Sequence, residues 1–288
     1  MKDYKVVGYF NGSVTLDSVT KCIGGYTDII FSFWVSPEQG VAGAAASAVG
    51  NSDIINSVKK AGKKCILAAG GSTYLPEVAD LQHAKEYGKA LAEYALANGF
   101  DGVDLDIENI QMNQQTLQWL AAVTNAVVSV ATEKKTTLQI SHAPQAPYFH
   151  KTEGYAKLEE LTAGRIDYYN IQYYNQGSYA YQAYEDFSSM FDIEYLGVSN
   201  ETSVKSIITQ DSPKVPFEKV VIGKPITKDD VGSSNSTGYI PTCALIDILN
   251  QAKARKIPFG GVMGWKIDSD IDGAWGETLN ECLNGSKA

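Results

Sequence analysis

The sequence of 288 residues has no run of eighteen or more apolar residues, and its N-terminus shows no charged and apolar leader. We therefore expect no membrane span and no export signal within the chain as given. A leader removed earlier would leave the same sequence. We expect a secreted protein, with a cytoplasmic location as the alternative.

Basic residues are also scarce. The chain has 24 Lys and Arg against 33 Asp and Glu, for a net charge of −9 and a pI near 4.9. Without a basic face it cannot neutralise a phosphate backbone, which argues against nucleic acid as a partner. A neutral polysaccharide is compatible with this charge.

Cysteine is rare, and no C-x-x-C pair occurs. The four cysteines are Cys22, Cys65, Cys243 and Cys282. Their spacing argues against a zinc site or thioredoxin-like chemistry, and we expect neither a metal nor a cofactor. Cys65 lies in an apolar run and is expected to be a buried thiol. Cys243 and Cys282 fall on predicted C-terminal helices, and whether they pair stays open.

A serine triad has no signal in the sequence. There is no G-x-S-x-G, and the only histidines are His83, His142 and His150. We expect His83 on a helix surface and the other two in structural or rim positions.

Apolar, β-branched runs alternate with helical stretches, which is typical of a parallel sheet wrapped by helices. The predicted strands are Lys5–Phe10, Asp28–Val35, Lys64–Ala69, Gly102–Ile107, Thr137–His142, Asp167–Tyr173, Lys219–Pro225 and Phe259–Trp265. The predicted helices are Ile54–Lys60, Ala84–Ala97, Leu117–Thr132, Ser203–Thr209, Cys243–Ala254 and Gly276–Leu283. The stretches Gly40–Ser52 and Lys228–Gly238 are predicted to be surface loops.

Eight strands alternating with helices over slightly more than the usual ~250 residues predict an α/β fold, a (β/α)8 TIM barrel. The barrel is expected to form one catalytic domain over residues 1–288. A doubly wound sheet is the alternative, but no G-x-G-x-x-G follows the first strand.

The most informative segment contains three acidic residues in alternate positions. Strand alternation places Asp104, Asp106 and Glu108 on one face and three apolar residues on the other. In a barrel this acidic row lines the interior, with Glu108 at the C-terminal mouth. Crowded carboxylates raise at least one pKa toward the range that a general acid needs.

The residues around the acidic row disfavour three other interpretations of it. A solvated edge strand is disfavoured because the opposite face is wholly apolar. A buried ion-pair network is disfavoured because residues 99–119 contain no Lys or Arg. A calcium loop would need Gly and Glu where Asn109 and Gln115 stand.

The segment Asp101–Glu108, D-G-V-D-L-D-I-E, resembles the D-G-x-D-x-D-x-E signature of glycoside hydrolase family 18, the chitinases and their relatives. Ala68–Gly71 resembles the family's S-x-G-G, Gln172–Asn175 resembles Q-x-Y-N, and Gly261–Trp265 resembles its last strand. The resemblance spans the chain from the first strand to the eighth.

Three positions depart from the family pattern. Ala68 replaces a frequent Ser, which removes a hydrogen bond beneath the acidic row, and Asn109 replaces a frequent aromatic residue. Asn175 stands where many members carry Asp, which implies a lower pKa for Glu108 and an acidic working range.

The resemblance implies substrate-assisted, retaining catalysis. Glu108 is the implied proton donor, Asp106 orients the substrate's acetamido group, and Asp104 shares a proton with Asp106. Tyr174 is implied to donate to the acetamido carbonyl, and Trp265 to form an apolar floor under the sugar. The other substrate-binding candidates are Gln172, Asn175, Tyr9, Phe33 and Gly71.

The function that follows is an endo-acting chitinase, with chitin or N-acetylglucosamine oligosaccharides as its partners and a monomeric state. Residues 226–258 hold only a polar loop and one helix, which predicts a shallow, open groove. The alternatives are an endo-β-N-acetylglucosaminidase acting on N-glycans and a non-catalytic lectin or storage protein. Sequons at Asn11, Asn200, Asn235 and Asn284 permit glycosylation.

Overall fold

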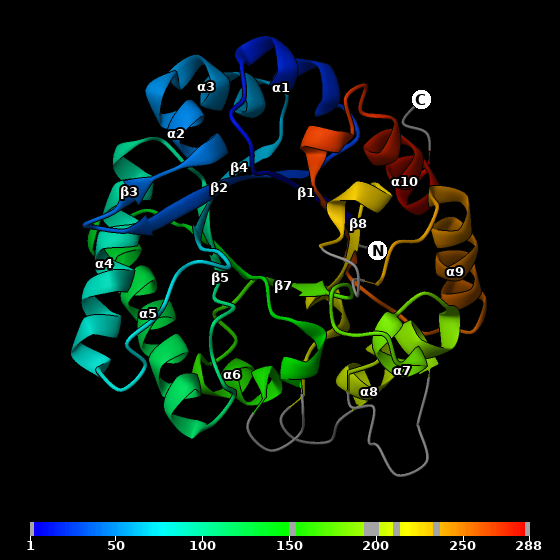
Figure 1. Ribbon diagram of the computed structural model, residues 1–288. Helices are drawn as coiled ribbons and strands as arrows, with labels where there is room; N and C mark the ends of the chain where they lie inside the picture. Colours follow the sequence, from blue (N-terminus) through cyan, green and yellow to red (C-terminus); the bar gives the residue numbers. More distant parts are fainter. Residues whose placement is uncertain (1–2, 150–153, 193–201, 210–213, 233–236, 286–288) are drawn as a thin grey trace.

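The computed structural model describes residues 3–149, 154–192, 202–209, 214–232 and 237–285. Its parallel strands are β1 (Lys5–Phe10), β2 (Asp28–Ser36), β4 (Lys64–Gly70), β5 (Gly102–Asp106), β6 (Gln139–His142), β7 (Tyr168–Gln172), β8 (Val220–Pro225) and β9 (Gly261–Trp265). They form a ring in the order β1-β9-β8-β7-β6-β5-β4-β2, which the pairing of β1 with β2 closes (Figure 1).

The helices surround this ring (Figure 1). They are α1 (Leu16–Cys22), α2 (Gly43–Gly50), α3 (Ser52–Lys60), α4 (Leu81–Ala97), α5 (Gln114–Glu133), α6 (Tyr155–Leu161), α7 (Ala180–Ala183), α8 (Val204–Thr209), α9 (Thr242–Ala254) and α10 (Ala274–Asn284). Short turns are the 3-10 helices η1 (Ala146–Phe149), η3 (Phe217–Lys219), η4 (Lys228–Asp230) and η5 (Ile267–Ser269), and the π-helix η2 (Ser188–Asp192). The fold is a single-domain (β/α)8 TIM barrel, as predicted.

Side-chain caps start the two long helices that lie beside the acidic strand. The Asp80 carboxylate accepts hydrogen bonds from the first backbone N–H groups of α4, and the Asn113 side chain accepts one from Thr116 N of α5. These contacts satisfy backbone donors that a helix start leaves unpaired. Residues 71–80 and 107–113, which connect these helices to the strands before them, form two loops at the mouth.

The prediction of a loop over Gly40–Ser52 is wrong. This stretch forms β3 (Gly40–Val41), antiparallel to β2, followed by α2. The small residues of this stretch suggest a loop, yet alanine is the strongest helix former. Ala44, Ala45 and Ala48 are buried on α2. The described part of Lys228–Gly238 holds only the turn η4 and is otherwise irregular, as expected of a loop.

Alternation along each strand divides the core into two parts. An outer core fills the space between strands and helices, and a smaller inner cluster fills the barrel. The inner cluster includes Val7, Ile30, Ile66, Val221 and Met263. The closed inner packing makes the barrel a filled core rather than a pore, so chemistry is confined to its mouth.

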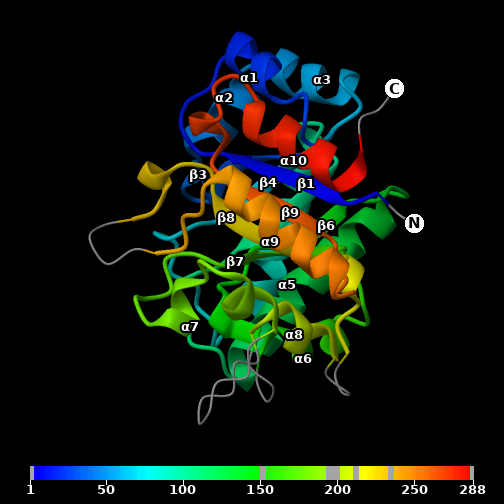
Figure 2. The ribbon, with the colours of Figure 1, turned by 90° about the vertical axis from the view of Figure 1, so that its right-hand side faces the viewer.

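The opposite end of the barrel is closed by paired polar groups. The Asp28 carboxylate accepts from Lys5 Nζ at 3.1 Å and from Tyr168 OH at 3.3 Å. Tyr4, just before β1, exchanges two hydrogen bonds with the side chain of Asn284 at the end of α10, so both ends of the described chain lie here (Figure 2). The sequon at Asn284 is therefore occupied by a structural contact, and those at Asn200 and Asn235 fall outside the described residues.

All four cysteines are free thiols. Cys22 and Cys65 are buried, and burial raises the pKa of the Cys22 thiol to about 12. Cys243 is exposed, and Cys282 contacts Asn250 of α9 rather than Cys243. No disulfide therefore joins α9 to α10.

Candidate active site

The acidic row lies where alternation predicted it. β5 ends at Asp106, one residue earlier than expected, with Asp104 fully buried and Asp106 3% exposed inside the barrel. Glu108 follows beyond the strand and is half-buried. The row therefore runs from the closed interior to the mouth, and the interpretation as a solvated edge strand is excluded.

Three donors surround the Asp104 carboxylate. Tyr9 OH donates to Oδ2 at 2.7 Å, Ser141 Oγ donates to Oδ1 at 2.6 Å, and Asn170 Nδ2 donates to Oδ1 at 3.3 Å. Burial raises the pKa of Asp104 to about 6, although each donor favours the anion and opposes that rise. Tyr9, predicted to contact substrate, instead lies 1% exposed beneath the row.

Ser141 supplies the hydroxyl next to Asp104 that Ala68 lacks. Ala68 on β4 and Ser141 on β6 are the two cross-strand neighbours of Asp104. The hydroxyl that is missing on one side is therefore present on the other. This substitution was invisible in the sequence because the two residues meet Asp104 only when the strands pair.

Asp106 and Glu108 form a coupled carboxyl pair that Gln172 bridges. Gln172 Nε2 donates to Asp106 Oδ1 at 3.0 Å and lies 3.4 Å from Glu108 Oε1. Burial raises the pKa of both carboxyls, and the charge of Glu108 raises that of Asp106 further. A hydrogen bond between the two carboxyls raises the pKa of Asp106 and lowers that of Glu108, so the two side chains titrate as a pair.

No cation neutralises this pair. None of the ion pairs among the described residues includes Asp104, Asp106 or Glu108. Asp28, at the other end of the barrel, has Lys5 at 3.1 Å. The carboxyls at the mouth thus differ from Asp28 in having no cation partner among the described residues, and burial and hydrogen bonds set their pKa values.

Two contacts hold the backbone around Glu108, which lies beyond the sheet's hydrogen bonds. Tyr148 OH donates to the Glu108 carbonyl at 2.8 Å, and Asn109 Nδ2 donates to the carbonyls of Ser72 and Tyr74. Asn109 therefore joins two mouth loops rather than forming a wall. Tyr148, in the turn η1, was not predicted, and nothing in its local sequence indicates the contact.

Aromatic side chains frame the mouth. Tyr174, just after β7, is 4% exposed and belongs to the inner cluster, and its hydroxyl has no hydrogen-bond partner among the described residues. Burial and the nearby charges of Asp106 and Glu108 raise the pKa of Tyr174, so it keeps its proton as a donor. The half-buried Trp265 ring lies 5.8 Å from that of Tyr9 and 6.5 Å from that of Phe33.

Irregular backbone geometry places two of the predicted substrate-binding residues, Phe33 and Gly71. A register shift between Phe31 and Trp34 brings Phe33 into the inner cluster, on the same side as Ile30. Gly71 has a φ of +85°, its N–H donates to the Asp106 carbonyl at 2.7 Å, and a Cβ there would lie 3.0 Å from the Phe33 ring. Gly71 therefore permits close packing next to the row.

Asn175 makes its described contacts with the loop after β8. It is exposed, has a φ of +58°, and its Oδ1 accepts from Gly232 N at 3.2 Å. Its backbone N–H donates to the Thr237 carbonyl at 2.9 Å. The side chain thus joins the loop after β7 to the loop after β8.

The described histidines lie away from the row. His142 is fully buried on the outer face of β6, 3.1 Å from Thr124 Oγ1 on α5, and burial lowers its pKa to about 3. His83 is half-buried on α4, and His150 falls outside the described residues. His142 thus has the structural position expected of it.

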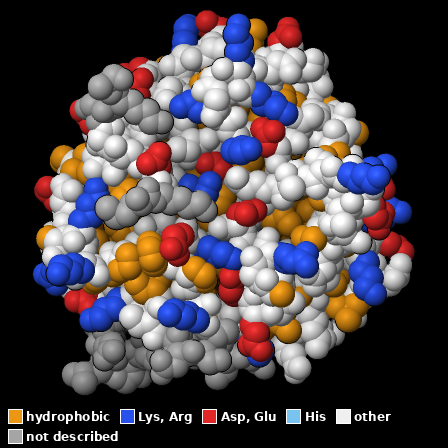
Figure 3. Space-filling view, turned by 180° about the vertical axis from the view of Figure 1, so that it is seen from behind, with side chains coloured by type: hydrophobic (Ala, Val, Ile, Leu, Met, Phe, Trp, Pro, Cys, Tyr) orange, Lys and Arg blue, Asp and Glu red, His pale blue; other side chains and the backbone are white. Residues whose placement is uncertain are grey.

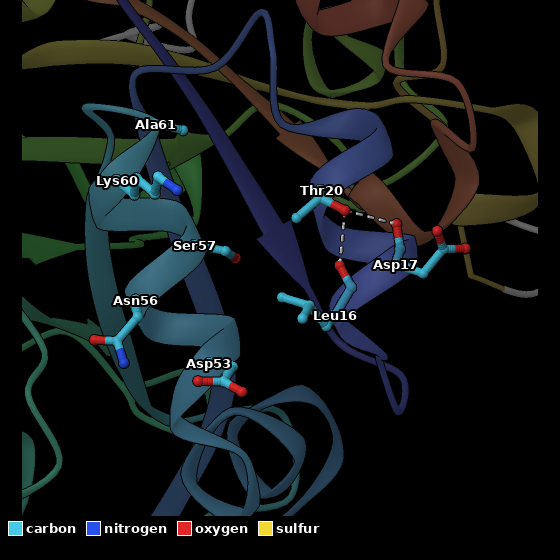
Figure 4. A pocket seen from close by; sticks show the side chains of 8 residues that line it. All are labelled: Leu16, Asp17, Thr20, Asp53, Asn56, Ser57, Lys60 and Ala61. Carbon is cyan, nitrogen blue, oxygen red and sulfur yellow. Dashed lines mark hydrogen bonds between the residues drawn. The ribbon is translucent and has the colours of Figure 1, made fainter.

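One hollow on the described surface lies away from the acidic row. A groove of about 800 Å3 lies on the outer wall between α1 and α3, lined by residues such as Thr20 and Asp53 (Figure 4). Lys and Arg intersperse with Asp and Glu on the face in Figure 3, which has no broad basic area. Across the described ranges, no cluster of three metal-ligating side chains occurs, and no helix is long and apolar enough to cross a membrane.

Comparison with known proteins gives consistent results. Residues 5–242 match the family model described as Glycosyl hydrolases family 18. A GH18 chitinase from Pseudoalteromonas aurantia superposes with a TM-score of 0.77 at 24% identity, covering 97% of this chain and 100% of that one.

Two further structures are similar. A putative chitinase A from Streptomyces coelicolor has a TM-score of 0.73 and 19% identity, covering 98% of this chain and 99% of its own. A GH18 chitinase from Cycas revoluta in complex with (GlcNAc)3 has a TM-score of 0.70 and 16% identity, covering 96% of this chain and 99% of its own. At these identities the likeness shows the fold. No curated protein sequence matched.

Proposed function

The chain belongs to family 18 of the glycosyl hydrolases, and from this membership we propose that it is an endo-acting chitinase. It cleaves the β-1,4 bonds between N-acetylglucosamine units with retention of configuration. The observation that carries the proposal is the Asp106–Glu108 pair at the barrel mouth, which Gln172 bridges at 3.0 and 3.4 Å and which has no cation partner among the described residues.

In the proposed reaction the substrate supplies the nucleophile. Its acetamido carbonyl oxygen attacks the anomeric carbon while the glycosidic bond breaks, and Glu108 gives its proton to the leaving oxygen. Asp106 accepts a hydrogen bond from the acetamido N–H, and the partnerless Tyr174 hydroxyl donates to the acetamido oxygen. Water then opens the oxazolinium-type intermediate as Glu108 takes back a proton.

The mouth geometry supports binding within a chain. Trp265 and Phe33 present apolar faces that suit the C–H faces of a sugar ring. The connection from β8 to β9 contains, in its described part, only η4 and α9, so no inserted domain closes over the groove. The scattered exposed apolar side chains support a monomer, and a polymeric substrate supports secretion.

Product analysis tests the proposal. The protein is incubated with a hexamer of N-acetylglucosamine and, separately, with a high-mannose glycopeptide. We expect internal cleavage of the hexamer, with the β-anomer formed first, and no release of the glycan. Cleavage of the glycopeptide alone supports the endo-β-N-acetylglucosaminidase, and binding of the hexamer without cleavage supports a lectin.

The Gln172→Met variant is expected to shift the basic limb of the kcat/KM profile to higher pH. The Gln172 amide stabilises the anions of Asp106 and Glu108, so its removal raises both pKa values. Glu108 then keeps its proton to higher pH. Profiles on a soluble oligomer give the limb, with the exposed Gln82→Met as the control, and a shift to lower pH would contradict the bridging role.

Ser141→Ala is expected to lower kcat about tenfold, because one hydrogen bond to a charged group is worth about 1.5–3 kcal/mol and part of it is lost. Adding Ala68→Ser should recover much of the loss, since both positions flank Asp104. Steady-state kinetics on the two variants and the wild type measure this. Equal rates for Ser141→Ala and the wild type would show that the hydroxyl is dispensable.

A further inference from the structure

Lys224 is a buried lysine that the proposed chemistry does not use. It lies on the outer face of β8, on the same side as Ile222, and is 0% exposed. No ion pair among the described residues includes it. Burial lowers its pKa to about 7, against the opposing effect of the exposed Glu185.

An apolar side chain of similar length would fill this space without the cost of removing an amino group from water. Lys224 therefore weakens the barrel unless its contacts serve another purpose. Its Nζ donates to two backbone carbonyls, Tyr173 O and Tyr184 O, each at 2.8 Å. These carbonyls mark the two ends of the segment 174–183.

The aromatic rings at the same two positions also pack together. The Tyr173 and Tyr184 ring centroids lie 5.0 Å apart, and both side chains bond to Thr202. Lys224 and these two tyrosines thus hold together the two ends of the loop after β7. Tyr184 adopts a left-handed conformation with a φ of +52°, which turns its carbonyl at this junction.

Tyr174 is the first residue of the loop and is packed from the other side as well. Gly238 lies so close that a Cβ there would be 2.5 Å from Tyr174 Cα. Asn175 N donates to the Thr237 carbonyl at 2.9 Å. The backbone at Tyr173 and Tyr174 is therefore contacted both by Lys224 and by residues 237–238.

We propose that Lys224 is a positioning residue that joins the Tyr173 and Tyr184 carbonyls and so fixes the backbone from which Tyr174 reaches toward the carboxyl pair. This inference rests on the proposed function for its catalytic consequence, since Tyr174 must contact the acetamido group. Its structural consequence is that the two ends of the segment 174–183 are held together, and this is independent of any activity.

A double-mutant cycle tests the catalytic consequence. Lys224→Met should lower kcat on a soluble N-acetylglucosamine pentamer about tenfold or more, because small misplacements of a positioned group are costly. In a Tyr174→Phe background the same change should cost less than about twofold, because the group that it positions is gone. Equal losses in both backgrounds, or no loss in either, overturn the proposal.

The matched control is Lys253→Met. Lys253 Nζ also donates to a backbone carbonyl, that of Cys282 at 2.8 Å, but it joins α9 to α10 away from the mouth. We expect its kcat to equal that of the wild type. If Lys224→Met does not accumulate as folded protein, the cycle is run with Lys224→Gln, which keeps an N–H2 donor on a shorter chain.

Amide hydrogen exchange tests the structural consequence in the intact protein. Peptides covering 174–184 should exchange at least about tenfold faster in Lys224→Met, while those covering β5 should not change. Unchanged exchange in 174–184 overturns the proposal. A wild type that binds but never cleaves the pentamer refutes the proposed function, and the exchange result still decides the role of Lys224.

Discussion

Glu108→Gln is expected to lower kcat by about 10²–10⁴, the range that general acid catalysis contributes. Glutamine has the size of glutamate but cannot give a proton to the leaving oxygen. Because the Glu108 backbone is held through Tyr148, the fold and oligosaccharide binding should persist. Steady-state kinetics on a soluble oligomer, together with calorimetric binding of the same oligomer, measure both quantities.

Glu133→Gln provides the control for this variant. Glu133 is the exposed last residue of α5, which begins near the mouth and ends at the opposite end of the barrel. The substitution removes the same charge without touching the site, so turnover should be normal. Near-normal turnover in Glu108→Gln itself would refute the assignment of the acid, and loss of binding there would indicate a folding defect.

Removing the N-acetyl groups from the substrate is expected to abolish cleavage. A deacetylated sugar carries an amine, which cannot form an oxazolinium ring, and no second enzyme carboxylate is assigned as nucleophile in the proposed mechanism. Intramolecular attack by a positioned group is worth an effective molarity of about 10⁵ M or more. We therefore expect at least a ~10³-fold difference in kcat/KM between acetylated and fully deacetylated pentamers.

Chain length is matched in this comparison, so loss of contacts along the groove cannot explain a difference. The deacetylated pentamer should still inhibit weakly through its ring faces on Trp265. Rapid cleavage of the deacetylated pentamer would show that an enzyme group attacks the anomeric carbon. Mass spectrometry of both digests distinguishes these outcomes.

Local patterns in the sequence predicted the barrel and its acidic row. The strand runs are short and carry apolar residues at least at alternate positions, and alternation alone places Asp104 and Asp106 on one face. Alternation along β7 likewise brings Asn170 to Asp104 and Gln172 to Asp106. These predictions succeeded because the strand period of two is a property of the local backbone.

Predictions failed where local signals competed. The sequence predicts a loop over Gly40–Ser52, although its alanines favour a helix. The substrate-binding candidate Phe33 does face inward, but only because of a register shift that depends on how β2 pairs with β4. Tyr9 is predicted from its strand position to contact sugar, but the barrel buries it as a hydrogen-bond donor to Asp104.

The strand order along the chain, the acidic row and the position of Glu108 at its end follow from residues that are adjacent in sequence. The groups that set the protonation of that row, and those that hold its partners in place, depend on how the barrel folds. Ser141 replaces a hydroxyl absent at Ala68, Tyr148 supports Glu108, and Lys224 joins two carbonyls of the loop that carries Tyr174. Each of these contacts joins residues on different strands or loops, and such pairs approach each other only when the barrel closes.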